Sequence, residues 1–161
     1  RAMTPATLLL NQHGITYVLH EYEHQASSKD YGLEAVAALN LNPNQVFKTL
    51  VCELTPIELA VAVVPVSSQL NLKAFAQAAG GKKARLADPK QVEAATGYVL
   101  GGISPLAQRK PLRTFIDRAS DDLSTIYISA GRRGLEIEIA PKDLLVLTRG
   151  QFAPIKSARS D

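Results

Sequence analysis

Lys48 is the residue of this sequence whose position says most about chemistry. Side chains alternate between the two faces of a strand, and a strand is expected over Val46 to Leu54. Lys48 then shares its face with the apolar Leu50 and with Cys52. An ammonium group on an apolar face is costly unless an anion or a carbonyl oxygen meets it. Lys48 is therefore a candidate ligand-binding cation, and the alternative is a lysine that extends past the strand into solvent.

A glycine-rich loop, Gly101-Gly102-Ile103-Ser104-Pro105, is the second candidate. Ser104 is suited to cap a helix that has Pro105 as its first residue, which leaves backbone N–H groups free. Such groups bind a phosphate or a developing oxyanion, and paired glycines let a ligand approach the backbone closely. The alternative is a plain strand-to-helix turn, because short glycine motifs are weakly specific.

Ser129 ends an expected strand beside a loop that carries Arg132 and Arg133. The serine hydroxyl is suited to bind a ligand hydroxyl or carbonyl, and the arginines are suited to bind phosphates. Equally, this loop is an exposed hairpin tip whose charges contribute only solubility.

Metal and nucleophilic chemistry have little support in the sequence. His20 and His24 lie four residues apart, but in a strand that leads into a loop and without a third ligand, so we expect surface histidines and no metal or other cofactor. Tyr22, between them, either lines a pocket or packs in the core. Cys52 is expected to be a buried structural thiol. A conventional nucleophile–His–Asp triad would have to be assembled from distant segments.

Short helices and strands must position these residues. The first expected helix is capped by Thr4 and ends at Gly14. The other expected helices are Gly32–Leu39, Leu72–Ala79, Pro89–Ala95 and Pro141–Leu147. Expected strands are Ile15–Tyr22, Val46–Leu54, Leu59–Val64, Arg85–Ala87, Tyr98–Leu100, Thr114–Ile116, Thr125–Ile128 and Leu135–Ile139, the last two as a hairpin. This irregular mixture predicts an α+β domain whose curved sheet closes into a barrel rather than a βαβ repeat.

Composition predicts one soluble domain over residues 3–161, preceded by a cloning remnant, Arg1 and Ala2. The 161 residues include 18 Lys and Arg against 15 Asp and Glu, a net charge of +3, and 46% are hydrophobic. The pI of about 9.1 permits a weak attraction to nucleic acid. The longest apolar stretch, Leu59 to Val66, is too short to cross a membrane. Without a visible secretory signal and with a single cysteine, a cytoplasmic protein is expected.

Several segments, in the right order, resemble the YbaK family of Cys-tRNA(Pro) deacylases, relatives of the editing (insertion) domain of bacterial prolyl-tRNA synthetases. The resemblance covers nearly all of the chain from Met3. Its segments are Met3–Ala6, Tyr22–His24, Leu41–Leu50, Leu59–Val66, Thr96–Tyr98, Gly101–Pro105, Ile126–Ser129 and Arg133–Glu138. It implies a mixed, largely closed β-barrel surrounded by short helices. It also implies trans-editing, the hydrolysis of cysteine mischarged onto proline tRNA, which protects translation fidelity.

The resemblance assigns site residues as well. It makes Lys48 the catalytic residue, in contact with either the substrate carbonyl or the terminal phosphate. The substrate-binding positions are Tyr22, Thr49, Gly101, Gly102, Ile103, Ser104, Pro105, Ser129 and Glu136. Glu136 stands where related sequences carry Asp. The implied mechanism is attack by the substrate's own thiol on its ester carbonyl, and the implied partners are the tRNA 3′ end and prolyl-tRNA synthetase in a ternary complex.

Two other functions stay open. One is a sibling trans-editing deacylase for alanine or serine, which lack a thiol and need a positioned water or a tRNA hydroxyl. The other is a non-catalytic module that binds tRNA or a synthetase, which the basic pI and the Arg132-Arg133 pair favour.

Overall fold

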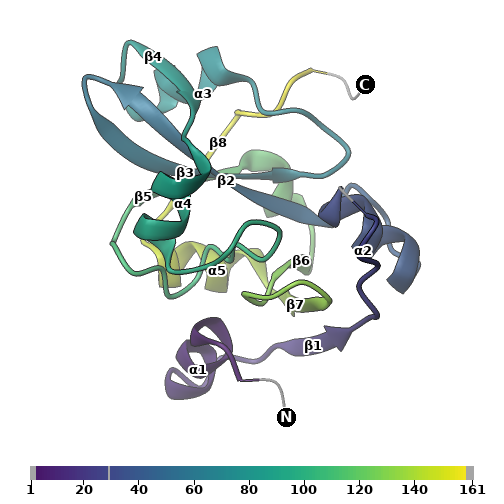
Figure 1. Ribbon diagram of the computed structural model, residues 1–161. Coiled ribbons are helices and arrows are strands. Elements are labelled where there is room, and N and C mark those ends of the chain that lie inside the picture. The colour runs from purple at the N-terminus through teal and green to yellow at the C-terminus, as the bar shows by residue number, and fades with distance from the viewer. Residues whose placement is uncertain (1–2, 29, 159–161) are drawn as a thin grey trace.

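The computed structural model describes residues 3–28 and 30–158, so the expected cloning remnant lies outside the described residues. Its elements appear in Figure 1. In chain order they are α1 (Pro5–Gln12), β1 (Val18–Glu21), α2 (Tyr31–Leu39), β2 (Phe47–Thr55), β3 (Glu58–Pro65), α3 (Leu72–Ala79), β4 (Lys83–Leu86), α4 (Pro89–Thr96), β5 (Arg113–Asp117), the 3₁₀ helix η1 (Arg118–Asp122), β6 (Ile126–Ser129), β7 (Leu135–Ile139), α5 (Pro141–Thr148) and β8 (Gln151–Ala153).

The strands form two sheets. The larger has the order β4-β2-β3-β5-β8, in which β3–β5 and β5–β8 are parallel, and the smaller is the antiparallel β1-β7-β6. One isolated parallel bridge, Val46 to Tyr127, joins them. Beyond it β2 pairs with β3 along most of its length and with β4 at Cys52–Thr55, and no further pairing with β6 follows among the described residues. The expected mixed α+β fold is thus confirmed, whereas over the described residues the sheets do not close into the expected barrel.

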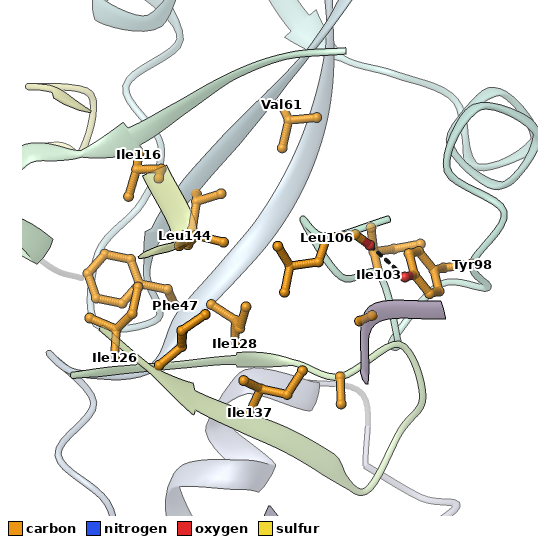
Figure 2. Close-up of a cluster of buried hydrophobic side chains, with 14 of the residues drawn as sticks. Phe47, Val61, Tyr98, Ile103, Leu106, Ile116, Ile126, Ile128, Ile137 and Leu144 are labelled. Carbon is orange, nitrogen blue, oxygen red and sulfur yellow. Dashed lines mark hydrogen bonds between the residues drawn. The ribbon is translucent and has the colours of Figure 1, made fainter. Parts of the chain in front are cut away.

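Two hydrophobic clusters explain why β2 and β3 form here. Residues at alternate positions, such as Phe47 and Val61, face a cluster between the sheets that includes Ile116, Ile128 and Leu144 (Figure 2). The intervening positions, such as Cys52 and Ala60, pack with Phe75 and Phe115 on the other face. Residues Ala60 to Val64 are fully buried, so this part of β3 is covered on both sides.

Most of the expected elements are present, and their ends follow local chemistry. Thr4 and Thr7 form a capping box at the start of α1, with Pro5 in the first turn. The hairpin of β6 and β7 is confirmed. The short strand β8 and the 3₁₀ helix η1 were not expected. Among the described residues, no helix is long and apolar enough to cross a membrane.

The segments before and after the glycines of the glycine-rich loop differ from the prediction. Tyr98–Leu100 is not a strand and no helix follows Ser104. The Tyr98 hydroxyl donates to the Leu106 carbonyl at 2.6 Å (Figure 2), so this segment folds back on itself. Ser104 Oγ accepts from the Leu106 N–H at 3.2 Å, and Ala107 has φ 57°, which no right-handed helix allows. The predicted helix cap is therefore wrong, and Ser104 closes a turn instead.

Candidate functional site

A cavity of about 400 Å³ lies where the start of β2 meets the β6–β7 hairpin. This volume is within the range of small-molecule sites. The two sheets supply one side, and the other side comes from the start of α2 and the glycine-rich loop. Its lining is Tyr22, Asp30, Tyr31, Gly32, Val46, Phe47, Lys48, Thr49, Leu50, Leu100, Gly101, Ile103, Ser129 and Glu136.

Seven of the ten residues that the sequence singled out line this cavity, and three do not. The seven are Tyr22, Lys48, Thr49, Gly101, Ile103, Ser129 and Glu136. Ser104 and Pro105 are buried outside it. Gly102 also lies outside, packed so closely on the hairpin tip that a Cβ would sit 2.9 Å from Arg132 Cα.

The sequence missed the cavity residues that α2 supplies. Asp30 caps α2 by accepting from the Leu33 N–H at 3.0 Å, and Tyr31 is the first residue of the helix. The capping pattern was readable from the sequence, but it points only to a helix. Nothing local indicates that this helix end lies against β2, because tertiary packing alone brings them together.

Lys48 is half-buried at the cavity wall, next to Val46 and Leu50 on β2. Burial lowers the pKa of Lys48, and the nearby Asp30 carboxylate acts in the opposite direction. Among the described residues, no carboxylate lies within ion-pair distance of the Lys48 ammonium group. A partly desolvated cation without an ion-pair partner can bind a carbonyl oxygen or a phosphate strongly.

Hydroxyl and carboxyl groups face the same space. Thr49 Oγ1 is fully buried and has no hydrogen-bond partner among the described residues, which is rare for a buried polar atom. Ser129 Oγ accepts from the Gly131 N–H at 3.1 Å, so its own proton can be donated. Burial raises the pKa of Glu136 to about 8 and, together with that neighbouring carboxyl, raises the pKa of Tyr22 to about 12. Both groups are therefore mainly protonated donors near neutral pH.

Arg133 holds the glycine-rich loop against α2. Its guanidinium lies 4.4 Å from the centre of the Tyr31 ring and donates to the Leu100 carbonyl at 3.0 Å. Gly101 has φ +89°, and a Cβ there would lie 2.8 Å from the Tyr31 ring. Only glycine fits this junction without strain. Arg133 is thus engaged at the cavity mouth, and Arg132 lies 3.9 Å from Glu21.

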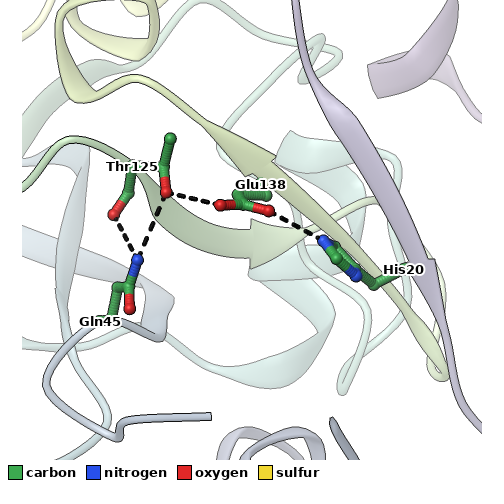
Figure 3. A network of polar contacts seen from close by, with 4 residues as sticks. All are labelled: His20, Gln45, Thr125 and Glu138. Atoms are coloured by element: carbon green, nitrogen blue, oxygen red, sulfur yellow. Dashed lines mark hydrogen bonds and ion pairs between the residues drawn. The ribbon is translucent and has the colours of Figure 1, made fainter.

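A polar network joins the smaller sheet to Gln45, two residues before β2 (Figure 3). His20 Nε2 lies 3.0 Å from Glu138 Oε1, and Thr125 Oγ1 donates to Glu138 Oε2 at 2.7 Å. The Gln45 side-chain amide donates to the Thr125 carbonyl at 2.9 Å. This network fixes the start of β2, three residues before Lys48, relative to the strands that carry Ser129 and Glu136.

His20 and His24 are not the surface residues that the sequence predicted. Both are partly buried against carboxylates, and His24 Nδ1 lies 2.7 Å from Glu34 Oε1. No set of three candidate metal ligands occurs in the described part of the chain. Cys52 is buried farther along β2, on the same face as Lys48 and Leu50 but outside the cavity lining, and burial raises the pKa of its thiol to about 12. The cavity thus offers a cation, neutral donors, the Asp30 carboxylate and backbone groups, and no histidine or cysteine of the described residues lines it.

The chain is similar to known proteins over almost its whole length. Residues 28–147 match the family model described as the aminoacyl-tRNA editing domain. The chain is 40% identical, over 94% of its length and 92% of the relative's, to an Enterococcus faecalis protein named "Putative Cys-tRNA(Pro)/Cys-tRNA(Cys) deacylase EbsC".

Solved structures agree with this match. A crystal structure described as "a putative trans-editing enzyme for prolyl tRNA synthetase" is 25% identical, with a TM-score of 0.81, over 98% of this chain and 100% of the other. The hypothetical protein APE2540, 24% identical, has the same fold, with a TM-score of 0.84 over 96% of this chain and 100% of the other. The chain therefore belongs to the aminoacyl-tRNA editing domain family, as its sequence segments predicted, and is an aminoacyl-tRNA deacylase.

Proposed function

We propose that this enzyme deacylates Cys-tRNA(Pro) in trans, with the aminoacyl-adenosine end of the tRNA in the cavity. The observation that carries the proposal is the combination of Lys48, the unpartnered Thr49 Oγ1 and the Gly101 backbone around a space that has no histidine or cysteine. Such a site can orient an ester and stabilise charge on its carbonyl oxygen, but it offers no obvious protein nucleophile. The name of the 40% identical relative supports the same substrate.

The reaction that suits this site uses the substrate's own thiol. The cysteine sulfur attacks the ester carbonyl carbon, the bond from that carbon to the ribose oxygen breaks, and the thiol proton ends on that oxygen. The products are a cyclic thioester and a tRNA with a free 3′ end. Holding the thiol beside the carbonyl removes an entropic barrier that reaches roughly 7–11 kcal/mol in the best intramolecular cases.

Glu136 lines the cavity as a mainly protonated carboxyl. Hydrolysis of alanyl or seryl esters, which lack a thiol, would require a base that takes a proton from water. Burial raises the pKa of Glu136 to about 8, so most of this carboxyl is protonated near pH 7. A protonated carboxyl donates a hydrogen bond instead, for example to the substrate's carbonyl or ribose oxygens.

In this proposal Lys48 contacts the carbonyl oxygen that gains negative charge, or else the phosphate at the 3′ end. Loss of one such donor typically lowers a rate by about 10²–10³-fold. Lys48→Ala should therefore lower the rate of cysteine release by that factor, whereas Lys90→Ala, an exposed lysine on α4, should not change it. Equal rates for wild type and Lys48→Ala would remove Lys48 from the mechanism.

A panel of charged tRNAs tests the substrate. At equal concentration, Cys-tRNA(Pro) should be deacylated faster than the alanyl and seryl forms. A 2-aminobutyryl ester, which has the size of cysteine without its sulfur, should resist hydrolysis. Rapid hydrolysis of that ester would contradict thiol attack, and preference for alanine or serine would favour a sibling editing enzyme. Failure to turn over any charged tRNA would favour a binding module.

The partners in this proposal are the charged tRNA and, in a ternary complex, prolyl-tRNA synthetase, which would supply the tRNA in the cytoplasm. A net charge of +3 is small for tight capture of tRNA by one domain. We therefore expect weak binding of free tRNA that weakens further with salt. Co-sedimentation with prolyl-tRNA synthetase in the presence and absence of tRNA(Pro) tests the complex.

A further inference from the structure

A second groove, of about 560 Å³, shares no lining residue with the cavity. Leu9 of α1 borders it on one side and the end of α5 on the other, and the segment 105–114 runs along it. This segment continues directly from the cavity, because Ile103 lines the cavity and Pro105 lines the groove. Two residues of extended chain span at most roughly 7 Å, so the groove begins beside the cavity wall.

The groove is cationic. Lys110 and Arg149 line it, both are exposed, and neither side chain has an ion pair or hydrogen bond in the part of the chain that the structure describes. No aspartate or glutamate of the described residues lines it. Residues 97–116, which connect the cavity to the groove, also include no acidic residue. Arg113 lines the groove too, but its guanidinium is paired with Glu58 at 2.7 Å.

The other polar groups of the groove are already engaged as donors. Thr114 and Thr148 donate their hydroxyls to the carbonyls of Leu112 and Leu144, at 3.1 and 2.8 Å. The Gln108 amide donates to the Ser104 carbonyl at 3.0 Å. The remainder of the lining is mostly apolar, for example Leu9, Leu112 and Leu147. Two cations without a partner, on a largely apolar surface, suit a polymer in which phosphates recur along a less polar backbone.

We propose that this groove binds the sugar-phosphate backbone of the tRNA whose 3′ end occupies the cavity, with Lys110 and Arg149 each at a phosphate. This inference rests on the proposed function. In Figure 1, α1 and α5, which border the groove, lie at the left, and α2, which borders the cavity, lies at the right. The groove lies outside the cavity proposed to hold the ester, so in this proposal it serves the polymeric part of the substrate and not the chemical step.

The test compares two double variants that lose the same charge. Lys110→Gln with Arg149→Gln removes the groove cations, and Lys73→Gln with Lys90→Gln removes two exposed lysines elsewhere. For Cys-tRNA(Pro), the groove variant should raise KM about tenfold at unchanged kcat, and the control should not. For a cysteinyl ester of the CCA trinucleotide, all proteins should be equal. The slope of log Kd against log salt for uncharged tRNA should become shallower by up to about 2 in the groove variant.

Each result either supports or overturns the proposal that the groove binds the tRNA backbone. Wild-type KM and wild-type salt dependence in the groove variant overturn the proposal, and so does an equal loss in the control, which would reflect net charge alone. An equal loss on the trinucleotide ester also overturns it, because the effect would then lie in the cavity. If the wild type hydrolyses no charged tRNA, the proposed function fails, and the binding of uncharged tRNA by the same variants still decides whether the groove holds RNA. Circular dichroism confirms that each variant is folded.

Discussion

The Arg133 guanidinium stacks on the Tyr31 ring at 4.4 Å, and through this contact the tip of the β6–β7 hairpin is fastened to the start of α2. The same guanidinium donates to the Leu100 carbonyl, next to Gly101. Three segments that are far apart in sequence thus meet at the mouth of the cavity. The backbone that is proposed to face the substrate ester owes its position to this contact.

Replacement of Arg133 should therefore lower activity as well as stability. Arg133→Ala removes a stacked cation and one hydrogen bond, worth together about 1–2 kcal/mol, and should lower kcat/KM for Cys-tRNA(Pro) about tenfold. Arg132→Ala is the matched control, because Arg132 reaches only the exposed Glu21 at 3.9 Å. Deacylation kinetics check both variants. Identical kinetics for the two would show that the contact does not position the loop.

Gly101 should tolerate no side chain. Gly101→Ala forces a Cβ to 2.8 Å from the Tyr31 ring at φ +89°, and should cost about 1–3 kcal/mol of stability together with most of the activity. Gly14→Ala separates strain from crowding, because Gly14 also has a positive φ, +63°, but has no atom within 4 Å of its added Cβ. Urea denaturation and deacylation rates measure both effects. The crowding argument fails if the two alanine variants behave alike.

The free energy of unfolding should fall as pH rises, because the buried Glu136 carboxyl must then ionise. Its folded-state pKa, about 8, lies above the ordinary value of 4.5, so the folded protein keeps a proton that the unfolded chain releases between these values. The linked stability is complete below pH 4.5 and is lost as pH rises through 8.

Glu136→Gln, which cannot ionise, should match the wild type near pH 5 and exceed its free energy of unfolding at pH 9 by on the order of a few kcal/mol. Glu138→Gln should show the opposite dependence of stability on pH. Hydrogen bonding by Thr125 lowers the pKa of Glu138, so its contribution is lost as pH falls. Denaturant unfolding across pH 4 to 9 distinguishes the two. A constant difference between wild type and Glu136→Gln would refute the assignment.

The network around Glu138 should matter for stability (Figure 3). Thr125→Val keeps the shape of the side chain but deprives the Glu138 carboxylate of a 2.7 Å hydrogen bond, which should cost about 1–3 kcal/mol. Thr148→Val loses only a local bond to its own helix and should cost less. Thermal unfolding of the two variants tests this, and a smaller loss for Thr125→Val than for Thr148→Val would contradict it.

Local rules predicted the elements better than the way they pack. The alternation along β2 correctly indicated a strand with Lys48 among apolar neighbours, and Thr4 and Pro5 correctly marked the start of α1. The same rules failed at Tyr98–Pro105, where a tertiary hydrogen bond from Tyr98 to Leu106 overrides the expected strand and helix cap. Sequence analysis missed Tyr31, and it offered Arg133 as a phosphate ligand or an exposed charge, because only the folded chain brings the Arg133 guanidinium onto the Tyr31 ring.

The single bridge between Val46 and Tyr127 has a consequence for substrate selection. Lys48 belongs to one sheet and Ser129 and Glu136 to the other, so the width between them depends on the angle at which the sheets meet. Ile128 and Leu144 belong to the hydrophobic cluster between the sheets and lie outside the cavity lining. Changes in their size should nevertheless alter which amino acids fit, so discrimination among aminoacyl groups is in part a property of the hydrophobic interior.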